Sequence, residues 1–118
     1  MPRVVHFEIA ASEPERASEF YRKVFGWEIK KWDGPQPYWL VSTGNKEQPG
    51  IDGGILKGNN GTVNSIDVDS VDDYISKVTA SGGKVAMPKM EIQGVGFIAY
   101  CQDTEGNTFG LFQPTHKH

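Results

Sequence analysis

The chain repeats its own pattern at a nearly constant offset, and this internal duplication limits the folds open to it. Helix-capping signals at Ser12 and Ser70 lie 58 residues apart, and the glycines expected to end those helices, Gly26 and Gly83, lie 57 apart. The apolar, glycine-containing segments that close each half align at an offset of 56 residues. We therefore predict two copies of one structural unit.

The first copy has the pattern of a βαβββ unit. Residues 4–9 alternate between apolar and polar side chains, which is typical of a strand with one buried face. A helix should follow, begun by a capping box in which Ser12 is the N-cap and Glu15 reaches back to it. Its apolar stripe is predicted to pack on Val5, Phe7 and Ile9 of the strand and contains Ala17, Phe20, Tyr21, Val24 and Phe25. Three further strands are predicted from residue 27, at 38–42 and at 53–57.

The second copy follows the same order. A strand is predicted at 63–68, and Ser70 is the N-cap of a helix that ends at Gly82-Gly83. The apolar stripe of this helix consists of Val71, Tyr74, Ile75 and Val78. Strands from residue 84, at 97–101 and at 108–113 complete the copy. The predicted fold class is α+β, with repeats at about 4–58 and 62–113 of a single domain spanning 1–118.

Composition limits the partners that we expect. The 118 residues carry a formal net charge of −3 with scattered Lys and Arg, which argues against nucleic acid as a partner. No apolar run is long enough to span a membrane, and the first residues lack a signal peptide's pattern. The single cysteine, Cys101, has no partner for an internal disulfide and is interpreted as a small buried apolar residue. A cytoplasmic location is the expectation.

The polar face of the first predicted strand in each copy is the best candidate for a binding site. His6 and Glu8 alternate with the apolar face of the first strand, as Ser65 and Asp67 do in the second copy. A βαβββ unit buries one face of its sheet under its helix and leaves the other open. Polar side chains on a partly enclosed open face are where a small-molecule site is expected.

Several segments resemble a known superfamily. Val5-His6-Phe7-Glu8-Ile9, the run 13–21, Phe25-Gly26-Trp27 and the closing Asp103-Thr104-Glu105-Gly106-Asn107 are similar to the vicinal-oxygen-chelate proteins, which include glyoxalases, bleomycin-resistance proteins and dioxygenases. The resemblance covers about residues 4–113. It implies two βαβββ repeats forming a cupped half-barrel of mixed sheet with helices outside. It also implies a homodimer.

The resemblance further implies a divalent metal held by four ligands, one from each of four strands. Carried over to this chain, the first ligand position is His6. The other three fall on Gly54, Val63 and Gly110, none of which has a metal-binding side chain. Since a divalent ion needs about three protein ligands, we predict a metal-free cavity and no cofactor. A shifted set of His6, Glu8 and Asp67 is the alternative.

Each candidate residue has a functional and a structural interpretation. His6 is either a general base or a strand-bonding histidine, and Glu8 with Asp67 are either an acid/base pair or solvated carboxylates. The aromatic candidates for ligand contact are Trp39, Tyr100 and Phe112, which otherwise belong to the core. Gly54 and Gly110 leave space either for a ligand or for close strand packing.

These observations lead to one preferred function and three alternatives. The preferred hypothesis is a homodimeric, metal-independent protein that binds a small, partly apolar or aromatic molecule, with His6, Glu8, Trp39, Ser65, Asp67, Tyr100 and Phe112 as contact candidates. One alternative is a metal-dependent lyase, isomerase or dioxygenase with a non-standard ligand set. The others are an acid/base enzyme without metal and a purely structural or interaction role.

Overall fold

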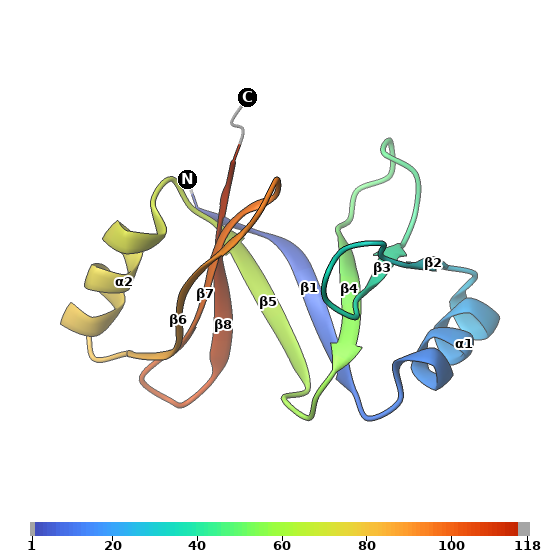
Figure 1. Cartoon of the computed structure of the whole chain (residues 1–118), viewed down its shortest axis with the longest axis horizontal. Helices are drawn as coiled ribbons and strands as arrows, with labels where there is room; N and C mark the ends of the chain where they lie inside the picture. Colours follow the sequence, from blue (N-terminus) through green and yellow to red (C-terminus); the bar gives the residue numbers. More distant parts are fainter. Residues whose placement is uncertain (1, 116–118) are drawn as a thin grey trace. The chain divides into compact units, whose positions relative to one another are not determined.

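The computed structural model describes residues 2–115 and contains the βαβββ order twice (Figure 1). The first copy contains β1 (Arg3–Ala11), α1 (Pro14–Phe25), β2 (Glu28–Lys31), β3 (Trp39–Ser42) and β4 (Asp52–Lys57). The second contains β5 (Thr62–Asp67), α2 (Val71–Ala80), β6 (Lys84–Ile92), β7 (Gly96–Gln102) and β8 (Thr108–Pro114). The predicted α+β class and its duplication are confirmed. The chain divides into two compact units, residues 6–63 and the remaining described residues.

In the first unit the strand order is β2-β3-β4-β1, with β1 parallel to β4 and the other pairs antiparallel. The register sets His6 opposite Asp52, and Gly54 opposite both Glu8 and Leu40. Because paired residues share a face of a sheet, these five residues lie on one face. We call it the open face of the first repeat.

Helix α1 packs on the opposite face of the sheet. The side of the helix that contacts the sheet differs from the predicted one. The core there contains Ile29, Trp39, Val41 and Ile55, with Phe7, Ile9, Ala17, Tyr21 and Trp27 packed against it. Phe20 and Val24, expected in the core, are each 55% exposed, and Val5 is 42% exposed. The side of α1 that faces the sheet includes Ser18 instead, which is fully buried. Its hydroxyl donates to the carbonyl oxygen of Pro14, so the buried polar group is satisfied.

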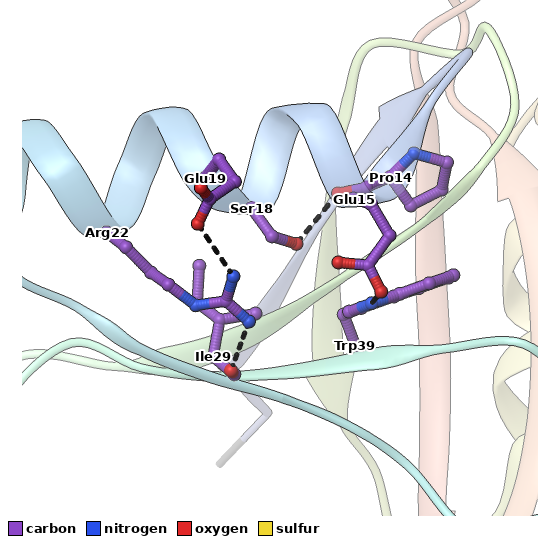
Figure 2. A network of polar contacts seen from close by, with 7 residues as sticks. All are labelled: Pro14, Glu15, Ser18, Glu19, Arg22, Ile29 and Trp39. Carbon is purple, nitrogen blue, oxygen red and sulfur yellow. Dashed lines mark hydrogen bonds and ion pairs between the residues drawn. The ribbon is translucent and has the colours of Figure 1, made fainter.

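Polar contacts fix α1 on β2 and β3 (Figure 2). The Trp39 indole Nε1 donates to Oε2 of Glu15 at 3.1 Å, and Arg22 donates to the carbonyl oxygen of Ile29 at 2.6 Å. The predicted capping box is therefore wrong, because Glu15 bonds to Trp39 and the N-cap is Glu13, whose side chain makes no capping bond. The other end of α1 is as predicted: Gly26 has a positive φ of 72° and its N–H donates to the Arg22 carbonyl.

In the second unit the strand order is β5-β8-β7-β6, with β5 parallel to β8. Ser70 is the N-cap of α2, as predicted, and its hydroxyl accepts the Asp73 N–H at 3.1 Å. The core under α2 contains Val68, Val71, Ala99, Cys101 and Leu111. Neither helix within residues 2–115 is long and apolar enough to cross a membrane.

Candidate functional site

The hydroxyl of Tyr38 joins two side chains on the open face of the first repeat. It lies 2.7 Å from Nε2 of His6 and donates to Oε2 of Glu8 at 3.1 Å. His6 and Glu8 come from β1, whereas Tyr38 directly precedes β3. The alternation of β1 therefore places His6 and Glu8 side by side, and a residue 30 or more positions away completes a three-residue cluster. We call it the His6–Tyr38–Glu8 cluster.

Gly54 makes the cluster possible. A β-carbon at this position would overlap with the hydroxyl and the ring of Tyr38. The phenol thus occupies the space directly above the glycine and reaches across β4 to β1. A glycine inside a strand often marks such a close approach. Of the two predicted roles for Gly54, close packing is the one present, and the group that packs there is a tyrosine.

The His6 imidazole is neutral at physiological pH. Burial lowers the pKa of His6 below its ordinary value of 6.5, because the charged form loses hydration. The nearby carboxylates of Glu8 and Asp52 raise this pKa, but by less. Asp52 lies beside His6 in the ladder, and its Oδ1 accepts the backbone N–H of Thr43 at 2.9 Å.

The cluster has aromatic and apolar neighbours. The ring of Trp32 meets that of Tyr38 edge to face, with centroids 6.5 Å apart, and the His6 and Tyr38 rings are nearly parallel. Leu40 lies in the same row as Gly54 and Glu8, and its side chain is 46% exposed. The open face thus combines hydrogen-bonding groups with an exposed apolar side chain.

Trp39 does not line this face. It is 6% exposed and belongs to the core under α1, where its indole bonds to Glu15. Adjacent residues of a strand point to opposite faces, so Tyr38 rather than Trp39 lies beside His6. The core interpretation of Trp39 is therefore correct, and the prediction that it contacts ligand from this face is wrong.

The second repeat has a related open face. Ser65 lies opposite Gly110, which lies opposite Tyr100, and a β-carbon at Gly110 would be 3.0 Å from the Ser65 hydroxyl. Asp67 lies opposite Phe112, whose other neighbour in the ladder is Ile98. Ser65 and Asp67 therefore share a face, as predicted, and the pairing places Tyr100 and Phe112 on the same face.

Glu8 and Asp67, predicted to occupy nearly equivalent places in the two copies, lie on corresponding strands but differ in position by two residues. Gly54 and Gly110 are the matching glycines of the two closing strands, and Glu8 and Ser65 are the residues opposite them. Ser65 is therefore the counterpart of Glu8, and Asp67 is an exposed residue two positions further along β5. Val63 is the counterpart of His6, as predicted, and is 6% exposed.

The residues present do not fit the divalent metal that the resemblance implies. Glycine and valine side chains supply no ligand at three of the four positions, and Nε2 of His6 is already bonded to Tyr38. The Tyr38 phenol fills the space where a carboxylate at position 54 would stand. Within residues 2–115, no three His, Cys, Asp or Glu side chains lie close enough together to hold an ion.

Tyr38 and Trp32 belong to the site, although neither is among the residues that the sequence pattern predicts for it. The sequence signal for such a residue is the glycine at position 54, because a glycine within a strand indicates that another side chain lies close to the backbone there. Cys101 is fully buried, and burial raises the pKa of its thiol, which agrees with the prediction of an inert, small apolar residue.

Comparison with known proteins identifies the family. Residues 3–111 match the model of the Glyoxalase/Bleomycin resistance protein/Dioxygenase superfamily. The chain belongs to this superfamily. It is also 30% identical, over 90% of its length, to a protein of Mycobacterium bovis named "Putative glyoxylase CFP32". The chain spans less than half of that relative, 43% of its length.

Solved structures share the superfamily fold at low sequence identity. A hypothetical protein, BH1468, from Bacillus halodurans has a TM-score of 0.74 at 13% identity, covering 99% of this chain and 97% of its own. The methylmalonyl-CoA epimerase of Streptomyces coelicolor has a TM-score of 0.72 at 16% identity, covering 97% and 98%. A superfamily member from Vibrio splendidus has a TM-score of 0.66 at 19% identity, covering 97% and 99%. At these identities the likeness shows the fold alone.

Proposed function

We propose that this superfamily member binds a small, partly apolar or aromatic molecule on its open sheet faces without a metal ion. The observation that carries the proposal is the Tyr38 hydroxyl, which lies over Gly54 and bonds to both His6 and Glu8. A tyrosine thus occupies the place where the superfamily pattern has a metal ligand. The cluster replaces a metal centre with a fixed set of hydrogen-bonding groups.

The neighbouring side chains support an apolar or aromatic ligand. Leu40 exposes nearly half of its surface beside the cluster, and Trp32 adds an aromatic ring next to Tyr38. Binding sites for small molecules typically combine apolar walls with a few placed polar groups. Among superfamily activities, enclosing a ligand fits these residues better than polarising one through a metal.

The proposal extends to the second repeat and to assembly. Ser65, Asp67, Tyr100 and Phe112 make its open face a second set of ligand-contact candidates. We further propose that the protein is a homodimer, as the superfamily pattern implies. Sedimentation velocity over a hundredfold concentration range tests that part directly.

The test of the binding function uses benzyl alcohol as a probe, with EDTA present throughout. In two-dimensional amide NMR spectra, the signals of β1 and of residues 38–42 should shift as the alcohol is added. Tyr38→Phe should weaken binding, and Tyr74→Phe on α2, which removes the same hydroxyl elsewhere, should leave it unchanged. Binding that appears only after a divalent ion is added would contradict the proposal and favour a metal-dependent lyase, isomerase or dioxygenase.

A further inference from the structure

The connection between β4 and β5 contains the one asparagine of the sequence that a glycine follows. Residues 58–61 read Gly-Asn-Asn-Gly, and Gly61 directly follows Asn60. The other asparagines, each followed by a larger residue, are Asn45, Asn59, Asn64 and Asn107. Gly61 has a φ of 72°, a conformation that glycine adopts without steric cost. The turn therefore places a glycine directly after an asparagine.

The reactive groups of this Asn-Gly pair are unobstructed. Asn60 and Gly61 are both exposed, and a β-carbon at Gly61 would meet nothing within 4 Å. Among the described residues, no recorded hydrogen bond involves the Asn60 side chain or the Gly61 N–H. The main-chain nitrogen of Gly61 is therefore available to the side-chain carbonyl carbon of the asparagine before it.

The other asparagines are held in place or hindered. The side chain of Asn45 accepts two backbone N–H groups of its own loop, at 3.1 and 3.2 Å. The Nδ2 of Asn107 donates to Oδ2 of Asp103 at 3.1 Å, and Asn64 lies within β5. Asn59 is exposed, but the residue after it has a side chain that hinders attack by its main-chain nitrogen. The Asn-Gly pair is thus the least protected of these positions.

We propose that Asn60 is a site of spontaneous deamidation, since asparagine is a chemically labile residue. The Gly61 nitrogen bonds to Cγ of Asn60, its proton passes to the departing amide, and ammonia leaves as a succinimide ring closes. Water then adds to one of the ring's carbonyl groups, and the C–N bond at that carbonyl breaks. Opening at the side-chain carbonyl gives aspartate, and opening at the main-chain carbonyl gives isoaspartate. Either product adds one negative charge to the formal net charge of −3.

The isoaspartate form should loosen the turn. The Gly58 N–H donates to the Ala11 carbonyl at 3.1 Å, and the Gly61 carbonyl accepts the Ala10 N–H at 2.9 Å. These two hydrogen bonds attach both ends of the turn to the end of β1. Isoaspartate inserts one more carbon into the main chain between them, so the two bonds cannot both keep their present geometry. The modification therefore acts on the end of β1, independently of the proposed binding function.

Peptide mapping by mass spectrometry tests the site, after the full chain has been aged at mildly alkaline pH. Asn60 should convert to the acid several-fold faster than Asn45 or Asn107, with isoaspartate in excess over aspartate. Asn60→Gln keeps a carboxamide but must close a larger ring, so this position should stay unmodified. Equal rates at Asn60 and Asn107, or aspartate without isoaspartate, would overturn the proposal.

Amide hydrogen exchange tests the structural consequence separately. The Ala10 and Gly58 amides should exchange several-fold faster in the isoaspartate form than in the fresh chain. Asn60→Asp is the matched control, because it adds the same charge with an ordinary main chain and should exchange at the wild-type rate. Unchanged exchange in the isoaspartate form, or equally fast exchange in Asn60→Asp, would overturn loosening by the longer main chain.

Discussion

Replacing Gly54 with alanine should disrupt the hydrogen bonds of the His6–Tyr38–Glu8 cluster, although Gly54 itself contributes no side chain to the cluster. The new β-carbon would overlap with the ring and hydroxyl of Tyr38. Because the displaced atoms are the far end of a side chain, the phenol swings away and the backbone keeps its place. The main loss is therefore the two hydrogen bonds of the hydroxyl.

The size of the effect follows from those bonds. An ordinary hydrogen bond contributes about 0.5–1.5 kcal/mol net, and one to a charged group about 1.5–3 kcal/mol. A change from glycine to alanine also stabilises by about 0.4–1 kcal/mol through the unfolded chain. We expect Gly54→Ala to lower the free energy of unfolding by about 1–4 kcal/mol. Each kcal/mol corresponds to a fall of roughly 3–6 °C in melting temperature.

Urea unfolding of a double-mutant cycle measures this coupling. In a Tyr38→Ala background the obstructing ring is gone, so Gly54→Ala should cost less than about 0.5 kcal/mol. Gly58→Ala is the matched control, since its β-carbon would meet only the Ala10 side chain at an ordinary 3.5 Å. An equal cost for Gly54→Ala with and without Tyr38 would refute the reasoning.

Three further predictions follow from the described contacts, each measured by urea unfolding. Ser70→Ala should lower the free energy of unfolding by about 0.5–2 kcal/mol, because it removes the N-cap of α2. Ser12→Ala should leave this free energy almost unchanged, because Ser12 is not the N-cap of α1. Equal losses of stability would contradict the assigned N-caps. Trp39→Ala should lower the free energy of unfolding by about 3–5 kcal/mol, because it truncates a core side chain. Phe20→Ser should change it by less than about 0.5 kcal/mol, because Phe20 is exposed. The reverse order of the two effects would place the core on the other side of α1. Because the pKa of His6 is lowered in the folded chain, the unfolded chain binds more protons at this residue than the folded chain just below pH 6.5. The contribution of His6 to stability is therefore complete above pH 6.5 and is lost as the pH falls towards the folded-state pKa. His6→Gln should remove this part of the pH dependence below about pH 6.5, and an unchanged slope would show that His6 is not its source.

Much of the fold could be predicted from local sequence patterns. The repeat, the order of strands and helices, Ser70 and Gly26 all depend on short-range signals of period and capping. The side of α1 that faces the sheet could not be predicted in the same way. Its apolar residues cover more than one face, and the fully buried position is Ser18, whose hydroxyl is satisfied inside the helix.

The site could be predicted only in part. Alternation along β1 correctly places His6 and Glu8 on one face, because that depends on neighbouring residues. The role of Tyr38 depends on how far a ring before β3 reaches across β4, which no local pattern reports. The lack of a local pattern also explains why Trp39 was wrongly predicted to contact a ligand on this face. A shift of one residue along a strand moves a side chain to the other face of the sheet.

Metal affinity tests the central claim most directly. Zinc, nickel and manganese would be titrated calorimetrically into the full chain carrying His116→Ala and His118→Ala. These two substitutions remove imidazoles outside the described residues, because imidazole is a common metal ligand. The Tyr38-filled site predicts no stoichiometric binding and no change in melting temperature with any of the three ions. One equivalent bound with a stabilisation of several degrees, both abolished by His6→Ala, would contradict the claim that Tyr38 has taken the place of a metal centre.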